Sequence, residues 1–260
     1  MRKKEAEGKE KDPENPKISE TRGGRRVGVM GGGFNPIHFG HLRAAEEMAE
    51  GFGLDPVVFV PTAIPPHKGG LSMAPFPHRF EMVKLSIEGR PGFVASDLEA
   101  RLPGPSYTVN TLKALGRELE PGSELFFLIG FDSFGKVGSW HKFPELFELA
   151  SFVVNVRPAG PGTASGPPAN PGSKELLLEL LAGFFGETPA WDGKKSACLI
   201  PGLRPVYYFE GTGLAISSTD IRSRLARGAS ARYLVPEATL DHLVRHGVYA
   251  DSPTTRKPAR

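Results

Sequence analysis

The stretch Gly31-Gly32-Gly33-Phe34-Asn35-Pro36-Ile37-His38-Phe39-Gly40-His41 is the most informative part of the chain. The apolar run Val27-Gly28-Val29-Met30 before it is typical of a short buried strand, and residues 42–49 after it have a helical composition. A strand, a glycine-rich turn and a helix start form a phosphate-binding geometry. Glycines let the backbone approach an anion, and the unpaired amides and dipole of a helix start attract negative charge. His38 and His41 add hydrogen-bonding imidazoles to this site.

Two other interpretations of the same stretch fit less well. The dinucleotide fingerprint G-x-G-x-x-G requires a third glycine where this chain has Pro36. The pair His38 and His41 has metal-ligand spacing, but no third ligand of obvious spacing lies nearby and the chain has one cysteine. We therefore expect an anion site and no metal held by the protein's own side chains.

A second segment, Ile216-Ser217-Ser218-Thr219-Asp220-Ile221-Arg222, follows an extended run and opens a helical stretch that continues to Ala226. Serine, threonine and aspartate are ordinary capping residues at a helix start. Capping does not explain Arg222 on the first turn, where its planar guanidinium can grip phosphate oxygens. The sequence therefore predicts a second anion-binding helix start.

The two segments, taken together, resemble the H-x-G-H and I-S-S-T-x-I-R signatures of the nucleotidyltransferase superfamily, which transfers nucleoside monophosphates from ATP or CTP. In that family the two histidines face the triphosphate. The resemblance implies catalytic roles for His38, His41 and Arg222.

Composition agrees with an enzyme of this kind. A chain of 260 residues can bury one substantial core, and its single Cys198 excludes an internal disulfide and suits the reducing cytoplasm. We expect no membrane span and no signal segment, because the sequence has no apolar run of the required length. The net charge of +3 gives no reason to expect nucleic-acid binding, and the pI near 8.9 suits small polyanionic substrates.

From residue 26 onward, the pattern alternates between strands and helices, which predicts one α/β domain over residues 26–249 with a doubly wound, Rossmann-like, mostly parallel sheet. Residues 1–25 are charged and poor in apolar residues, and we expect a disordered tail there. Residues 158–172 are rich in proline and glycine and are predicted to form a flexible loop, while 250–260 form a basic tail. Further strands are predicted at 57–61, 92–98, 125–129, 152–156 and 205–210, and helices at 77–88, 108–119, 175–181 and 235–246.

Further segments narrow the resemblance to bacterial nicotinate-nucleotide adenylyltransferases. Pro65-Pro66-His67-Lys68 follows a predicted strand end, where open α/β sheets place ligands, although a rigid turn with an exposed lysine is the plainer interpretation. The run Ser106-Tyr107-Thr108-Val109-Asn110-Thr111-Leu112 matches the family's Y-T-x-x-T-L segment. The resemblance implies that Lys68 binds the substrate phosphate and that Tyr107 and Thr108 meet the nicotinate ring and its carboxylate. Thr108 also suits a plain helix cap.

The stretch Gly130-Phe131-Asp132-Ser133-Phe134-Gly135-Lys136 satisfies the first seven positions of a P-loop. The eighth position is Val137, which has no hydroxyl for Mg²⁺, and the family's G-x-D turn fits better. Asp132 is then expected to bind a ribose. Trp140 suits a core position, but we favour stacking on the pyridine ring, because an aromatic face suits a flat heterocycle. Next to it, His141 stands where the family often has another aromatic residue, and Asn35 replaces a frequent aspartate.

The resemblance implies an enzyme that transfers AMP from ATP to nicotinate mononucleotide, giving deamido-NAD and pyrophosphate, with Mg²⁺ brought by ATP. A related adenylyl- or cytidylyltransferase acting on nicotinamide mononucleotide or phosphopantetheine, and a nucleotide-binding module without activity, are the alternatives. The sequence leaves homo-oligomerisation open. The residues assigned to ATP are Gly31, Gly32, Gly33, Phe34, Gly130, Asp132, Ile216, Ser217 and Ser218, and those assigned to nicotinate mononucleotide are Lys68, Tyr107, Thr108, Trp140 and His141.

Overall fold

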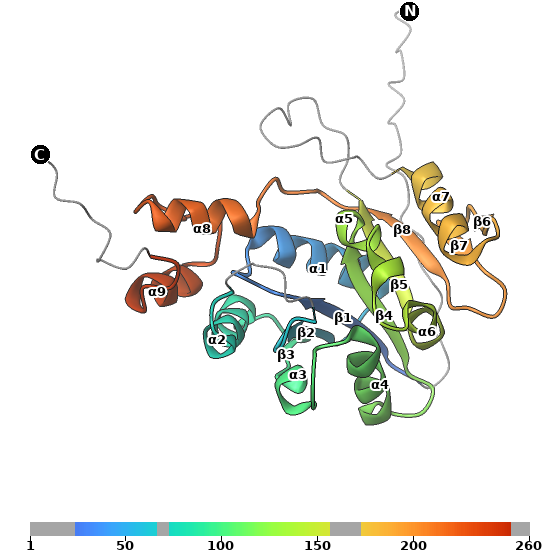
Figure 1. The fold of residues 1–260 in the computed structure, drawn as a ribbon, viewed down its shortest axis with the longest axis horizontal. Helices are drawn as coiled ribbons and strands as arrows, with labels where there is room; N and C mark the ends of the chain where they lie inside the picture. Colours follow the sequence, from blue (N-terminus) through green and yellow to red (C-terminus); the bar gives the residue numbers. More distant parts are fainter. Residues whose placement is uncertain (1–23, 67–72, 157–172, 251–260) are drawn as a thin grey trace, which may run out of the picture.

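Strand β1 lies near the middle of a twisted sheet, with β2 on one side of it and β4 on the other. The computed structural model describes residues 24–66, 73–156 and 173–250. Within these residues the sheet has the strand order β3-β2-β1-β4-β5-β8-β7-β6 (Figure 1). The strands are β1 Arg26–Gly32, β2 Val57–Pro61, β3 Phe93–Ala95, β4 Glu124–Gly130, β5 Ser151–Val156, β6 Ala190–Asp192, β7 Ala197–Leu199 and β8 Val206–Glu210.

The strands from β3 to β8 in this order are parallel, and β7 and β6 add an antiparallel hairpin at one edge. Central strands β2 and β5 are buried along almost their whole length, which explains their continuous runs of valine and phenylalanine. The expectation of a doubly wound, mostly parallel α/β sheet is confirmed.

The chain reverses its direction of travel across the sheet at β1. It leaves β1 for β2 and β3, and then returns to β4 on the opposite side of β1. Open α/β sheets bind ligands at the carboxyl ends of the strands on either side of such a reversal, which here are β1 and β4. The glycine-rich turn follows β1, and Gly130 ends β4 at the same edge.

Helices cover both faces of the sheet. Two separate clusters of buried apolar side chains lie on the two faces, one including Met48 and Met82 and the other including Leu112 and Phe147. The first cluster packs α1, α2, α8 and α9 against the sheet, and the second packs α3 to α7. The helices are α1 Phe39–Phe52, α2 Phe76–Ile87, α3 Leu98–Arg101, α4 Thr108–Glu118, α5 Phe131–Phe134, η1 Val137–Ser139, α6 Phe143–Leu149, α7 Lys174–Phe185, α8 Ser218–Ala226 and α9 Glu237–Arg245.

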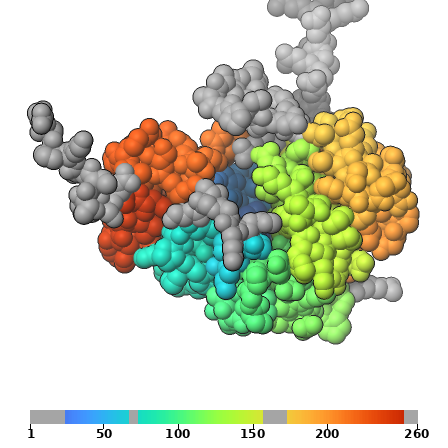
Figure 2. Space-filling view, viewed as in Figure 1, coloured from blue at the N-terminus to red at the C-terminus, as the bar shows by residue number. Residues whose placement is uncertain are grey.

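Helices α8 and α9 lie at one end of the molecule, and α7 with the β6–β7 hairpin lies at the other (Figure 1). In the space-filling view, the blue N-terminal elements show only between the orange α8 segment and the yellow-green segment around α5 (Figure 2). Helix α8 thus borders the N-terminal elements on this face. The last two helices are therefore close enough to contribute to a site at the end of β1.

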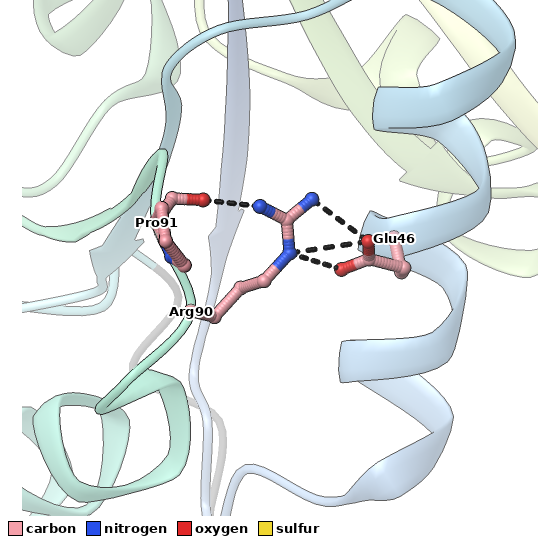
Figure 3. A network of polar contacts seen from close by, with 3 residues as sticks. All are labelled: Glu46, Arg90 and Pro91. Atoms are coloured by element: carbon pink, nitrogen blue, oxygen red, sulfur yellow. Dashed lines mark hydrogen bonds and ion pairs between the residues drawn. The ribbon is translucent and has the colours of Figure 1, made fainter.

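An ion pair ties α1 to the connection between α2 and β3 (Figure 3). The guanidinium of Arg90 lies 2.7 Å from Glu46 and also donates to the carbonyl of Pro91. The hydrogen bond from Arg90 is the main reason that the pKa of Glu46 falls below its usual value. Both side chains are partly exposed, so this pair contributes at most about 1 kcal/mol to stability.

Most elements predicted from the sequence are present within one or two residues of the expected bounds. The strand predicted over 92–98 was wrong in length, because β3 ends at Ala95 and α3 begins at Leu98. Helices α5 and α6 and strands β6 and β7 were not anticipated, since three to seven residues are too few to establish a period. Cys198 lies buried in β7, where burial raises the pKa of its thiol to about 11. No helix among the described residues is long and apolar enough to cross a membrane.

Candidate active site

The turn that joins β1 to α1 is held by hydrogen bonds to its own backbone carbonyls. Arg79 of α2, whose side chain is 2% exposed, donates from Nη1 to the carbonyl of Gly33 at 2.8 Å and from Nε to that of Ala74 at 2.8 Å. Burial lowers the pKa of this guanidinium. An arginine in such a place stabilises a chain segment that has no secondary-structure partner for its carbonyls.

Helix α8 contacts the same turn from the other side. The hydroxyl of Ser218 donates to the carbonyl of Pro36 at 2.9 Å, and Nη1 of Arg222 donates to the carbonyl of Asn35 at 2.7 Å. Nη2 of Arg222 also reaches Thr219 at 3.2 Å. Each of these terminal nitrogens carries a second N–H, so the guanidinium can hold the turn and still bind an anion. The two segments that the sequence singled out are therefore in contact.

The side chain of Asn35 links the turn to the last described part of the chain. Its Oδ1 accepts hydrogen bonds from the backbone amide of Ala74 at 3.0 Å and from the hydroxyl of Tyr249 at 2.5 Å. Asn35 is buried, and burial is the main reason that the pKa of the Tyr249 phenol is raised. Three carbonyls and one amide side chain of residues 33–36 are thus fixed by α2, α8 and the segment after α9.

Two helix starts lie next to each other at this site. His38 is the N-cap residue of α1, and Ser217 caps α8 by accepting a hydrogen bond from the amide of Asp220 at 3.1 Å. The first amides of a helix and its dipole favour an anion at its N-terminus. A Cβ at Gly40 would lie only 3.7 Å from the carbonyl of Ile216, so the two helix starts are neighbours.

His38 and His41 form a stacked pair at the start of α1. Their ring centroids lie 3.8 Å apart at 28°, and the backbone N–H of His38 donates to Nδ1 of His41 at 3.3 Å. The ring of Phe34 meets His41 edge-on at 5.3 Å. A Cβ at Gly40 would approach the His38 imidazole to 3.0 Å, so a larger residue there would press on this ring. The turn therefore holds both imidazoles in one fixed arrangement.

The loop that leads into α8 is anchored to α1. The amide of Thr212 donates to Glu47 at 2.8 Å and its hydroxyl binds the same carboxylate, which also accepts from Arg43 at 2.7 Å. Burial acts to raise the pKa of Glu47, but the hydrogen bonds from Thr212 and Arg43 lower it overall. Glu47 is therefore held as a carboxylate that fixes the distance between the two helix starts.

The predicted pyridine-binding residues form a second group. The rings of Tyr107 and His141 stack, with centroids 4.2 Å apart and an angle of 29° between their planes. Helix α4 begins at Thr108, and the side chain of its N-cap residue, Tyr107, makes no capping hydrogen bond. Trp140 meets Phe127 edge-on at 6.2 Å, and the Phe127 ring would lie 3.5 Å from a Cβ on Gly31. Trp140 is thus connected through Phe127 to Gly31 near the end of β1.

The other residues assigned to the substrates lie in different surroundings. Trp140 follows η1 and is half-buried against the apolar cluster, so part of its surface serves the core, as the plainer interpretation had it. Asp132 is exposed on the first turn of α5, next to Gly130 at the end of β4. Lys68 lies outside the described residues.

Sequence analysis missed Arg79, Tyr249 and Glu99, which all contact the site. An arginine in an amphipathic helix and a tyrosine near the end of a chain carry no motif, and only the fold shows that they are buried. Glu99 stands two residues after Asp97, and nothing in that spacing distinguishes it from surface carboxylates. Among the described residues, no group of three histidine, cysteine, aspartate or glutamate side chains could hold a metal ion.

Comparisons with known proteins agree with this geometry. The sequence model of the cytidylyltransferase-like family matches residues 29–224. A probable nicotinate-nucleotide adenylyltransferase of Syntrophotalea carbinolica is 41% identical over 224 residues, which are 86% of this chain and 97% of that protein. A probable nicotinate-nucleotide adenylyltransferase of Geobacter metallireducens is also 41% identical, over 86% of this chain and 98% of the relative.

The fold is similar to that of a solved structure. The nicotinic acid mononucleotide adenylyltransferase of Plasmodium falciparum, in complex with NaAD, superposes with a TM-score of 0.62 at 17% identity, over 86% of this chain and 97% of that chain. This likeness concerns the fold alone. Family membership follows from the sequence identity over most of both chains, and the paired helix starts lie in the region that the family model matches. The chain belongs to the cytidylyltransferase-like proteins and, within them, to the nicotinate-nucleotide adenylyltransferase family.

Proposed function

We propose that this protein transfers AMP from ATP to nicotinate mononucleotide, producing deamido-NAD and pyrophosphate. The observation that carries the proposal is the meeting of two helix starts at the glycine-rich turn, where Ser218 and Arg222 of α8 bind carbonyls of the turn before α1. One anion placed there faces two positive helix ends and two imidazoles. A triphosphate is the substrate group that uses all of them.

The residues divide into roles by their position. His38 and His41 donate hydrogen bonds to the triphosphate, with residues 31–34 providing backbone that an anion can approach closely. Ile216, Ser217 and Ser218 bring the start of α8 to the leaving pyrophosphate, which Arg222 holds. Gly130 and Asp132 lie at and after the end of β4, where Asp132 accepts hydrogen bonds from a ribose.

The reaction needs no general base and no covalent intermediate. An oxygen of the 5′-phosphate of nicotinate mononucleotide attacks the α-phosphorus of ATP, the bond from this phosphorus to the bridging oxygen breaks, and pyrophosphate leaves with that oxygen. The attacking phosphate is already ionised at neutral pH. Catalysis then consists of in-line positioning and of neutralising the charge that builds on the α-phosphate and on pyrophosphate.

Mg²⁺ enters this proposal as part of the ATP substrate. The described residues hold no cluster of acidic or imidazole ligands that could form a protein cage, and Mg²⁺ commonly keeps its waters and bridges phosphates. When bound with ATP, it neutralises phosphate oxygens. The imidazoles and Arg222 then act on the oxygens that remain.

The acceptor substrate occupies the second group of residues. Its pyridine ring stacks on Trp140 beside the Tyr107–His141 pair, and its carboxylate meets the start of α4 at Thr108. Lys68, on the segment after β2, is assigned to the acceptor phosphate by family resemblance. The alternatives, another acceptor or nucleotide binding without turnover, give no deamido-NAD in the assay described below.

The carbonyls of the turn must stay in place for ATP to bind, which gives a prediction for Tyr249. Tyr249→Phe removes the donor to Asn35, and we expect ATP to bind several-fold more weakly while stability falls by about 0.5–1.5 kcal/mol. Isothermal titration calorimetry and thermal unfolding measure the two effects. Tyr233→Phe is the matched control, because Tyr233 is 82% exposed. Equal ATP affinity in the two variants would contradict the proposed clamp.

A change at His41 tests the role of the imidazoles. If His41 stabilises charge in the transition state, His41→Ala lowers kcat by about 10²–10³-fold in a protein that remains folded. Steady-state kinetics and circular dichroism measure these two properties. His246→Ala, at an exposed histidine beyond α9, is the control. Near-normal turnover in folded His41→Ala protein would remove the histidine pair from the mechanism.

The acid form of the acceptor is expected to be preferred over the amide. A carboxylate only accepts hydrogen bonds, whereas an amide NH₂ placed against backbone N–H groups at the start of α4 leaves a mispaired contact that costs roughly 1–3 kcal/mol. This predicts a preference of about ten- to hundredfold in kcat/KM for nicotinate over nicotinamide mononucleotide. The assay separates deamido-NAD and NAD by chromatography.

Two substitutions separate the contribution of ring stacking from that of hydrogen bonding to the preference for the acid. Trp140→Ala is expected to weaken both acceptors alike, because either ring can stack on the indole. Thr108→Val is expected to narrow the difference between them, because it removes one donor near the carboxylate. Comparable efficiency of the unmutated enzyme with both mononucleotides would show that the start of α4 does not select the acid.

A further inference from the structure

Glu99 of α3 is a buried carboxyl group that the proposed reaction does not use. It is 7% exposed, and among the described residues it is the only aspartate or glutamate that is buried. Burying a carboxyl group is unfavourable unless hydrogen bonds replace its hydration. Its partners therefore indicate what the residue holds in place.

The two oxygens of Glu99 bind two different parts of the chain. Oε1 accepts a hydrogen bond from the hydroxyl of Thr111 at 2.7 Å, and Oε2 accepts one from the backbone amide of Ala63 at 3.3 Å. Thr111 lies on the first turn of α4, where its hydroxyl is also 3.4 Å from the carbonyl of Tyr107. Ala63 lies in the segment that follows β2.

A serine joins the same two segments directly. The hydroxyl of Ser106 accepts hydrogen bonds from the amides of Ala63 at 3.1 Å and Ile64 at 3.0 Å, and the amide of Ser106 donates to the carbonyl of Ile64 at 2.8 Å. The residues before α4 and the segment after β2 are thus paired by backbone and side-chain bonds. Glu99, which is buried, accepts a hydrogen bond from Ala63 of the segment after β2 and from Thr111 of α4.

We propose that Glu99 is a positioning residue for the acceptor substrate, which sets the start of α4 at Thr108 against the segment after β2. The proposal rests on the function proposed above, in which the acceptor's pyridine carboxylate meets the start of α4. Glu99 acts through Thr111, Ser106 and the amide of Ala63, and it does not touch the substrate.

The protonation of Glu99 is compatible with this role. Burial raises the pKa of its carboxyl group, while hydrogen bonds from Thr111, Ser106 and Ala63 and the charge of Arg79 oppose the shift. Either protonation state keeps an oxygen that accepts from Thr111. Its role as an acceptor is therefore retained when the carboxyl group takes up a proton.

The hydrogen bonds of Glu99 lie on the acceptor side of the site, and its interaction with Arg79 on the ATP side is one of charge. The turn after β1 is held by hydrogen bonds from Arg79, Ser218 and Arg222, and within the described part of the chain none of these three side chains donates a hydrogen bond to Glu99. Loss of Glu99 should accordingly move α4 relative to the acceptor while the triphosphate turn stays in place. A general loss of stability would affect both substrates.

The experiment compares KM for the two substrates in full-length variants. Glu99→Ala is expected to raise KM for nicotinate mononucleotide about tenfold or more while KM for ATP changes about twofold or less, and to narrow the preference for acid over amide. Glu99→Gln is expected to restore part of the loss, because its amide oxygen can accept from Thr111. Thr239→Val is the matched control. It removes a buried hydroxyl of α9 that is hydrogen-bonded to Ser86 of α2, and neither residue belongs to α4 or to the segment after β2.

A second variant keeps the test decisive if Glu99→Ala does not fold. Thr111→Val removes one donor to Glu99 and should raise KM for nicotinate mononucleotide several-fold. In the double variant with Glu99→Gln, the fold increase in this KM should be smaller than the product of the two single increases, because both changes break the same contact. An unchanged KM for nicotinate mononucleotide in folded Glu99 or Thr111 variants overturns the inference. An equal rise in both KM values, as in a destabilised Thr239→Val protein, also overturns it.

The same assay distinguishes failure of the inference from failure of the proposed function. If the unmutated enzyme forms no deamido-NAD from ATP and nicotinate mononucleotide, the proposed function is wrong and the inference falls with it. If the unmutated enzyme forms deamido-NAD and the variants retain its KM for the acceptor, the inference alone is wrong.

Discussion

The structure depends on how the backbone carbonyls of the turn after β1 are paired. Residues 33–36 belong to no helix or strand, and buried carbonyls without partners are costly. Arg79, Ser218 and Arg222 supply the missing donors, and Tyr249 fixes the side chain of Asn35. These bonds come from three regions of the chain, so the turn assembles only when α2, α8 and the segment after α9 are in place. The geometry that we propose binds phosphate is therefore a product of the whole fold and not of the glycine-rich motif alone.

Sheet topology explains why distant segments meet at this turn. Because the chain reverses direction at β1, the loops after β1 and β4 lie where open α/β sheets bind ligands, and β8 returns as a parallel strand two positions beyond β4. The loop after β8 is then tied to α1 through Glu47 and Thr212, which sets α8 beside α1. The starts of α1 and α8 thus lie side by side. The proposed acceptor side is built separately, from α4, the segment after β2 and the buried carboxyl of Glu99.

Much of the fold and the centre of the site could be predicted from the sequence, because both depend on local patterns. Continuous apolar runs indicated the buried strands, and the motifs around His38 and Arg222 identified both helix starts. The rest depends on tertiary contacts that leave no local mark. In the sequence, nothing distinguishes Arg79 and Glu99 from charged surface residues, although both are buried in the structure. The β6–β7 hairpin is too short to show a period, and Trp140 could be placed against the core only once its neighbours were known.

The central claim is that a single triphosphate occupies both helix starts. Hydrogen–deuterium exchange with a non-hydrolysable ATP analogue tests it most directly, because backbone amides that bind phosphate exchange more slowly. The account predicts that peptides covering residues 38–42 and 217–222 gain protection together and with the same dependence on analogue concentration. Protection of only one of these segments, or of neither, would contradict it.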